Sequence, residues 1–184
     1  MRIIGGQLRG KKLSPVRSAA IRPTSDRLRE AVFNILTENI EEALVLDLFA
    51  GTGALGIEAL SRGARRAVFI DNNRDAVALM YRNIRQCRLE NRSTVIRWDI
   101  TRNLDCLHRT GQPYDLVFLD PPYDRGLVLS ALQFLNRHHF LAAAARVVVE
   151  HAASEVFSPL PDGLTVTDTR KYGKSLVSFL VAVV

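Results

Sequence analysis

A chain of 184 residues is long enough to bury the core of one domain and short for two. Its 47% of hydrophobic and 24% of charged residues are typical of a globular protein, and no apolar run approaches the ~18 residues of a membrane span. We expect a cytoplasmic protein without membrane association, because the N-terminus also lacks an apolar leader segment.

The first 30 residues carry the whole basic excess of the chain, whose formal net charge is +6. They contain eight basic and two acidic side chains, whereas residues 31–184 contain 17 of each. A concentrated basic segment favours a polyanionic partner such as nucleic acid, although a solvated tail is the alternative.

The N-terminal elements are predicted from glycine placement and helical spacing. Residues 2–13 hold three glycines between short apolar or basic runs, which predicts a small β-hairpin, and a loop follows to residue 23. A helix is then expected to begin at Thr24 or Ser25, either of which could cap it. Its apolar face consists of Leu28, Val32, Ile35 and Leu36. We therefore divide the chain into a basic hairpin and loop, 1–23, and a main domain, 24–184.

From residue 43 on, short apolar runs alternate with helical patterns. The runs are Leu44–Phe49, Ala67–Ile70, Thr94–Trp98, Leu116–Leu119 and Arg146–Val149, with helices expected near 54–62, 73–88 and 126–137. Apolar strands separated by helices predict a parallel sheet covered on both faces. The last runs, Leu164–Thr169 and Leu176–Val184, predict a closing antiparallel hairpin. The predicted fold class is α/β: a doubly wound, Rossmann-like, seven-stranded sheet with an antiparallel last strand.

A glycine-rich turn follows the first strand of the main domain. Gly51-x-Gly53-x-x-Gly56 lets the backbone approach a nucleotide-like ligand, and the next helix presents free N–H groups there. The pattern also fits a dinucleotide site. Asp47 argues against a pyrophosphate, because its carboxylate would repel phosphate and suits an ammonium group.

Two further acids follow the next two strands. Asp71 stands 20 residues after Gly51, where a carboxylate can accept hydrogen bonds from both hydroxyls of a ribose. This position speaks equally for an adenosine cofactor and for NAD, and capping of the next helix is a third interpretation. Asp99 is placed to reach an adenine edge or to lie solvated in a loop.

The most specific motif is Asp120-Pro121-Pro122-Tyr123, directly after the fourth strand of the sheet. The two prolines fix the backbone and leave carbonyls that can accept from an amino group, while Asp120 accepts a second hydrogen bond from the same nitrogen. Tyr123 offers a face on which a splayed base can stack. Because an exocyclic amine has its lone pair delocalised into the ring, acceptors on both N–H groups favour a pyramidal, nucleophilic nitrogen. The motif therefore predicts methylation of an exocyclic amine.

Together these residues resemble class I S-adenosylmethionine-dependent methyltransferases. The resemblance is closer to the bacterial 16S ribosomal RNA (guanine(966)-N2)-methyltransferases and covers essentially the whole chain. Its family-specific part is N-terminal: Arg2–Gly6 with Arg9–Leu13, and Arg22–Arg27 with Arg29-Glu30 and Phe33-Asn34. Asp47–Ala59 and Asp120–Tyr123 match the more widely shared motifs. One departure is Asp71, where the family more often has Glu.

The resemblance implies S-adenosylmethionine as cofactor and ribosomal RNA as partner, within a small ribosomal subunit or its assembly intermediate. The expected catalytic residues are Asp120, Pro121, Pro122 and Tyr123. The expected cofactor-binding residues are Asp47, Phe49, Ala50, Gly51, Thr52, Gly53, Asp71, Asn72 and Asp99. The expected RNA-binding residues are Arg2, Arg9, Lys11, Lys12, Arg22, Arg27 and Arg29.

Three other functions fit parts of this sequence. A DNA adenine-N6 or other nucleic-acid amino-methyltransferase would use the same motif, but the target-recognition domain expected of a sequence-specific DNA enzyme is missing. A non-catalytic RNA-binding assembly protein would not need an intact motif and glycine turn. An NAD-dependent oxidoreductase would need an acid/base pattern that the sequence lacks. Because the four histidines and two cysteines have no ligand or triad spacing, no metal is expected.

Overall fold

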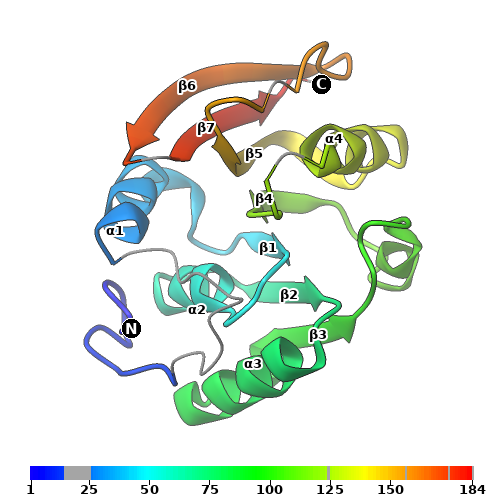
Figure 1. Cartoon of the computed structure of the whole chain (residues 1–184). Helices are drawn as coiled ribbons and strands as arrows, with labels where there is room; N and C mark the ends of the chain where they lie inside the picture. Colours follow the sequence, from blue (N-terminus) through cyan, green and yellow to red (C-terminus); the bar gives the residue numbers. More distant parts are fainter. Residues whose placement is uncertain (15–25, 124, 156, 174, 184) are drawn as a thin grey trace.

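The computed structural model describes residues 1–14, 26–123, 125–155, 157–173 and 175–183. Its strands are β1 (Leu44–Leu48), β2 (Arg66–Asp71), β3 (Ser93–Arg97), β4 (Tyr114–Leu119), β5 (Leu141–Ala152), β6 (Leu164–Tyr172) and β7 (Ser175–Ala182). They form one sheet in the order β3-β2-β1-β4-β5-β7-β6 (Figure 1). The first five strands are parallel, and β7 runs antiparallel to β5 and β6. The predicted fold class is confirmed.

Helices cover both faces of this sheet. They are α1 (Asp26–Ile35), α2 (Ala54–Ser61), α3 (Arg74–Cys87) and α4 (Leu127–Arg137), with short 3₁₀ turns at Thr37–Asn39, Glu90–Arg92 and Asp105–Arg109. Neighbouring strand residues point to opposite faces, so Val45 packs with α1, α2 and α3, while Leu46 packs with α4. This double burial explains why the central strands are almost continuously apolar. None of the helices in the described ranges has the length and apolar content needed to cross a membrane.

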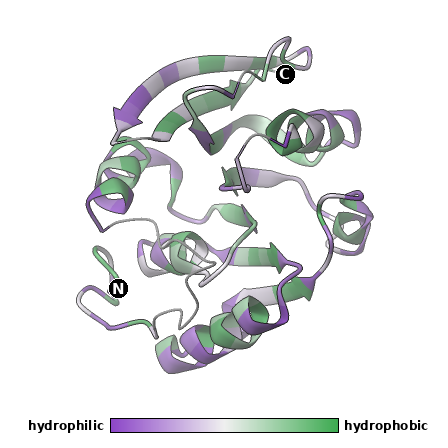
Figure 2. Cartoon of the chain, viewed as in Figure 1, coloured by the Kyte–Doolittle hydropathy of each residue, from purple (hydrophilic) through white to green (hydrophobic). Residues whose placement is uncertain are grey.

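The edge strand β6 differs from the interior strands. Most of its side chains are exposed, whereas β7 beside it is mostly buried. Figure 2 shows the same contrast, with hydrophilic colours dominating β6 and hydrophobic colours dominating β7. Charged residues such as Asp168, Arg170 and Lys171 on this edge oppose pairing with another chain.

The N-terminal segment, defined here as residues 1–14, folds back against α2. A single bridge pairs Arg2 with Lys12, and the Ile3 amide donates to the Lys11 carbonyl at 2.9 Å. The segment thus reverses direction without regular strands, so the predicted hairpin is not confirmed as a pair of strands. The predicted loop, the helix start at Thr24 or Ser25 and the division after residue 23 lie outside the described residues.

Buried polar groups fix this segment to the main domain. The Glu58 carboxylate, fully buried on α2, accepts from the Ile4 and Gly5 amides at 2.8 and 2.7 Å. Asn83 on α3 accepts from the Ser14 amide at 2.8 Å and donates to the Thr52 carbonyl at 3.0 Å. The segment is therefore connected to the glycine-rich turn through one side chain.

The buried position of Arg29 contradicts its predicted role in RNA binding. We predicted that it binds RNA, but its side chain is completely buried and donates to the Arg2 carbonyl and the Asp26 carboxylate, both at 2.7 Å. Helical periodicity places it off the apolar face of α1, yet the N-terminal segment covers that position. Arg29 thus holds this segment and does not present its charge to a partner.

Candidate active site

A pocket of about 770 Å³ opens at the carboxyl ends of the parallel strands, where doubly wound sheets bind their ligands. It brings together the turn after β1, the end of β2, the segment after β4, the end of β5 and the β6–β7 turn. Its lining is Arg27, Leu28, Asp47, Phe49, Ala50, Gly51, Thr52, Ala54, Leu55, Asp71, Asn72, Asn73, Asp120, Pro121, Pro122, Tyr123, Glu150, Lys171, Tyr172, Gly173 and Ser175. Both predicted motifs therefore face one cavity.

The glycine-rich turn has a backbone that other residues would strain. Gly53 has a φ of 74° and precedes the first residue of α2. A Cβ added at Gly56 would lie 2.3 Å from the ring of Phe69, so only glycine lets α2 pack this closely on β2. Gly53 shapes the turn and, unlike Gly51 and Thr52, does not itself line the pocket.

Asp71 connects the end of β2 to this turn. One of its oxygens accepts from the Gly51 amide and the other from the Asn73 amide, both at 2.8 Å. Asn73 caps α3, accepting from the Asp75 and Ala76 amides, so the capping role considered for Asp71 belongs to Asn73. Each carboxylate oxygen has a second lone pair, which leaves Asp71 able to accept from the hydroxyls of a ribose.

Asp47 is a buried acid in the middle of the pocket. Its carboxylate is 2% exposed and accepts from the Gly56 amide at 2.9 Å. Burial raises its pKa well above the ordinary value, and the negative charges of Asp120 and Asp71 raise it further. A cationic ligand group would relieve this unfavourable cluster of acids, which fits the ammonium group expected here.

We expect Asp47→Asn to stabilise the free protein while weakening its cofactor affinity. A carboxyl whose pKa is raised on folding destabilises the folded state at neutral pH, and this cost vanishes as the pH falls to the ordinary value of 3.8. The gain in Tm should therefore be largest at neutral pH and shrink toward pH 4. Thermal unfolding across this range and calorimetry with S-adenosylmethionine measure the two effects. Asp162→Asn, in an exposed turn, is the control, and a lower Tm for Asp47→Asn at pH 7 would contradict the assignment.

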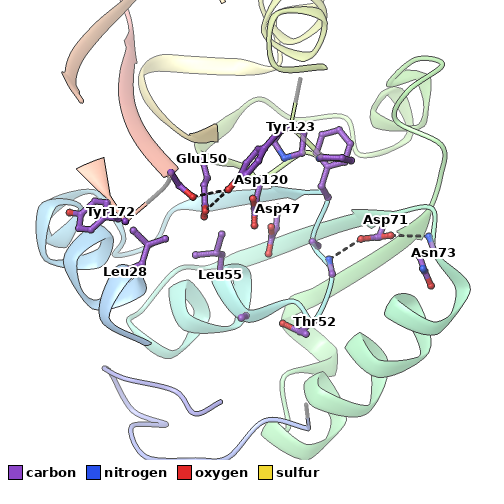
Figure 3. A pocket seen from close by; sticks show the side chains of 18 of the residues that line it. Leu28, Asp47, Thr52, Leu55, Asp71, Asn73, Asp120, Tyr123, Glu150 and Tyr172 are labelled. Carbon is purple, nitrogen blue, oxygen red and sulfur yellow. Dashed lines mark hydrogen bonds between the residues drawn. The ribbon is translucent and has the colours of Figure 1, made fainter. Parts of the chain in front are cut away.

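The Asp120–Tyr123 segment lies in the same pocket, with Asp120 beside Asp47 (Figure 3). The Tyr123 hydroxyl donates to Glu150 Oε1 at 3.0 Å and lies 2.8 Å from Ser175 Oγ. Burial and the nearby carboxylates of Glu150 and Asp120 raise the Tyr123 pKa, so the phenol stays protonated. These contacts fix the orientation of the ring.

Two ends of the pocket differ in character. In Figure 3, Asp71 and Asn73 lie at one end, Asp47 and Asp120 in the middle with Glu150 beside them, and Leu28 and Tyr172 toward the other end. Near Glu150 the wall is formed by the apolar side chains of Leu28 and Leu55 and the ring of Tyr172. The geometry thus provides a polar end suited to a ribose and an end suited to a flat ring, with the acids between them.

Not every predicted residue reaches this pocket. Asp99 lies outside the lining and accepts from Thr101; hydrogen bonds from Thr101 and Asn72 lower its pKa. The basic residues of the N-terminal segment lie away from the pocket, with Arg2, Arg9 and Lys12 exposed and Lys11 half-buried. Of the predicted RNA-binding residues that the structure describes, Arg27 alone lines the pocket. Arg22 lies outside the described residues.

Sequence reasoning missed several lining residues, above all Glu150, Ser175 and Tyr172. Glu150 directly follows the buried run Arg146–Val149 on a parallel strand, so the rule that identified Asp120 would also have found it. Tyr172 ends β6 and Ser175 begins β7, so the pairing of these two strands brings them to the pocket. No local sequence pattern predicts this position.

The lining fits S-adenosylmethionine. Asp71 can accept from ribose hydroxyls, the turn from Phe49 to Thr52 offers close backbone approach, and Asp47 suits the ammonium group. Among the described residues, no group of three or more His, Cys, Asp or Glu side chains is arranged to hold a metal ion.

Known proteins are similar in sequence to this chain over most of its length. The chain matches the family described as conserved hypothetical protein 95 over residues 1–181. Ribosomal RNA small subunit methyltransferase D of Escherichia coli K12 is 41% identical over 161 residues, which cover 88% of this chain and 78% of that protein. A Bacillus subtilis protein provisionally named the rRNA methyltransferase YlbH is 32% identical and covers 94% of each chain. A solved Escherichia coli structure, provisionally described as the methyltransferase yhhF, is 34% identical with a TM-score of 0.84, over 100% of this chain and 98% of that chain.

Proposed function

This chain belongs to the conserved hypothetical protein 95 family, and we propose that it methylates ribosomal RNA of the small subunit with S-adenosylmethionine as methyl donor. The finer part of the proposal is the target, the exocyclic N2 amine of a guanine. The observation that supports the chemistry is the placement of Asp120–Tyr123 and the glycine-rich turn in one pocket. The names of the relatives support RNA as the substrate.

The residues of the pocket have separate roles in this reaction. When bound, the cofactor supplies an electrophilic methyl group on a sulfonium. Asp120 and the Pro121 carbonyl accept the two N–H groups of the amine, which directs the nitrogen lone pair toward the methyl carbon. With the cofactor bound, this nitrogen would form the new N–C bond as the S–C bond breaks, and the electron pair of the broken bond would stay on sulfur. The amine then loses one proton to Asp120 or to water.

The target base has to leave its stack to enter the pocket. Tyr123, held by Glu150 and Ser175, offers a fixed face for stacking. Leu28 and Leu55 exclude water around the ring. The chain thus binds and orients the base, and the orientation makes a weakly nucleophilic amine reactive.

Two cations at the pocket suggest how the RNA backbone is held. Arg27 on α1 and Lys171 at the end of β6 both line the pocket, although they are far apart in the sequence. A nucleotide extruded into the pocket would bring its flanking phosphates near these side chains. The RNA surface would then extend from the basic N-terminal segment to the β6–β7 turn.

We expect the double variant Arg27→Ala/Lys171→Ala to bind RNA more weakly and with a smaller salt dependence. Each lost phosphate contact should reduce the slope of log K against log[salt] by about 0.7–0.9. Binding of small-subunit RNA at several salt concentrations measures the slope. Arg137→Ala, in the last turn of α4 outside the pocket lining, is the control. An unchanged slope in the double variant would remove both residues from the RNA surface.

The decisive test is methyl transfer from labelled S-adenosylmethionine to unmethylated small subunits, naked small-subunit RNA and DNA, followed by nucleoside analysis. We expect N2-methylguanosine in the subunit or its RNA, and the better substrate shows the assembly state that is recognised. Methyladenine in DNA would overturn the substrate and leave the chemistry intact. Cofactor binding without any transfer would instead favour a non-catalytic assembly protein.

A further inference from the structure

Glu150 stands beside the acid of the proposed catalytic motif. The parallel register pairs Leu119 of β4 with Val149 of β5, so the next residues, Asp120 and Glu150, are neighbours across the two strands. Both line the pocket, and Glu150 lies between Asp120 and the apolar wall (Figure 3). Besides Asp47 and Asp120, the pocket therefore holds the carboxylate of Glu150 close to the position expected for the reacting amine.

One oxygen of this carboxylate is engaged and the other remains for a ligand. The single proton of the Tyr123 hydroxyl is donated to Glu150 Oε1, so the Ser175 hydroxyl donates to the Tyr123 oxygen. Within the described part of the chain, no hydrogen bond reaches Glu150 Oε2. The relay from Ser175 through Tyr123 thus orients Glu150 and leaves Oε2 as an acceptor in the pocket.

The bases differ in what they present next to the exocyclic amine. In guanine the ring nitrogen beside the amine, N1, carries a hydrogen and is a donor. In adenine and cytosine the equivalent ring nitrogen is an acceptor with an exposed lone pair. A carboxylate facing this position would accept a hydrogen bond from guanine and repel the other two bases.

From this juxtaposition we infer that Glu150 is a specificity-determining residue, which accepts the N1–H of the target base and so selects guanine. The inference rests on the proposed function and deepens it. Asp120 alone recognises an amine, which guanine, adenine and cytosine all carry. Two adjacent carboxylates, Asp120 and Glu150, match the run of donors that guanine alone presents on N2 and N1. The hydrogen bond from Tyr123 to Oε1, with Ser175 holding the Tyr123 hydroxyl, keeps Oε2 directed at the N1 edge of the base.

The test compares guanine with 2-aminopurine at the methylated position. 2-Aminopurine keeps the 2-amino group but has an unprotonated N1. Small subunits are reconstituted with RNA carrying either base, and single-turnover rates are measured for the wild-type protein and Glu150→Gln. Glutamine keeps an oxygen for the Tyr123 hydroxyl and places an N–H donor where Oε2 stands.

We expect the wild-type protein to prefer guanine by a factor of about 100 or more beyond the intrinsic reactivities. In Glu150→Gln the ratio of the two rates should fall at least about tenfold, because the amide can donate to N1 of 2-aminopurine. Comparing the ratio between the two proteins cancels the intrinsic reactivity of each base. Calorimetry with S-adenosylmethionine and thermal unfolding verify that the variant is folded and binds its cofactor.

Tyr123→Phe tests the orientation of Glu150 separately. It removes the hydroxyl that donates to Oε1 but keeps both carboxylates, so the ratio of the two rates should fall, though less than in Glu150→Gln. An unchanged ratio in Glu150→Gln would overturn the role of Glu150 and leave the proposed function standing. N6-methyladenosine as the wild-type product would overturn both, because a carboxylate would then face a lone pair.

Discussion

Asp120→Ala is expected to lower kcat by about 10²–10³-fold while the affinity for S-adenosylmethionine changes little. Asp120 lies between Asp47 and Tyr123 in the pocket, where its carboxylate can hold one N–H of the reacting amine (Figure 3). Its removal leaves the amine conjugated with the ring and poorly directed, so the loss falls on the chemical step. Single-turnover methyl transfer and calorimetry measure the two quantities separately.

The graded variant Asp120→Asn tests the same role more finely. Its amide oxygen can still accept a hydrogen bond, so the rate should lie between those of the wild-type protein and Asp120→Ala. Asp162→Ala, in an exposed turn, is the matched control. A near-normal rate for Asp120→Ala would remove Asp120 from the mechanism, and lost cofactor affinity would reassign it to the cofactor.

Asp120→Ala should also change the surroundings of Asp47. The negative charge of Asp120 contributes to the raised pKa of the Asp47 carboxyl, after burial. Removing that charge lowers the pKa of Asp47 and favours its ionised form. Cofactor affinity in Asp120→Ala should therefore be maintained or slightly improved, which distinguishes a catalytic defect from a damaged pocket.

Local patterns predicted the parallel core well, because burial on both faces produces continuous apolar runs. The run Arg146–Val149 was recognised, yet β5 extends from Leu141 to Ala152. Its beginning is a run of alanines, which favour helix, with Ala144 at a φ of 59° and a register shift opposite β4. Pairing with β4, a contact distant in sequence, overrides the local preference.

Only part of the pocket could be predicted, because local patterns do not encode contacts distant in sequence. Residues at the ends of parallel strands, such as Asp71 and Asp120, follow from the strand pattern, because those ends meet at one edge of the sheet. Tyr172 and Lys171 reach the pocket only through the antiparallel register of β6 and β7, which no single run encodes. The prediction that Arg29 binds RNA was wrong because its burial depends on the N-terminal segment. Its contact there, Arg2, lies 27 residues away along the chain.

Glu58→Ala should destabilise the protein by about 3–5 kcal/mol, the cost typical of breaking a buried charge pair. Glu58 is fully buried, its Oε1 accepts from Arg62 Nε at 2.8 Å, and its two oxygens hold the Ile4 and Gly5 amides. Alanine leaves both amides and the guanidinium of Arg62 without their acceptor. Tm should fall by about 2–4 °C for each kcal/mol. Thermal and urea unfolding measure the loss, with the exposed Glu38→Ala as control.

The same variant should weaken RNA binding more than cofactor binding. Ser61 also holds the N-terminal segment, since its hydroxyl accepts from the Leu8 amide at 3.0 Å and donates to the Gly5 carbonyl at 2.6 Å. With Glu58 gone, the contacts of Ser61, Asn83 and Arg29 have to order the segment and its exposed cations. RNA affinity should fall and its salt dependence flatten at temperatures where the fold persists. If Glu58→Ala bound RNA as tightly as the wild-type protein, the N-terminal segment would serve only to stabilise the fold, and the RNA surface would lie elsewhere.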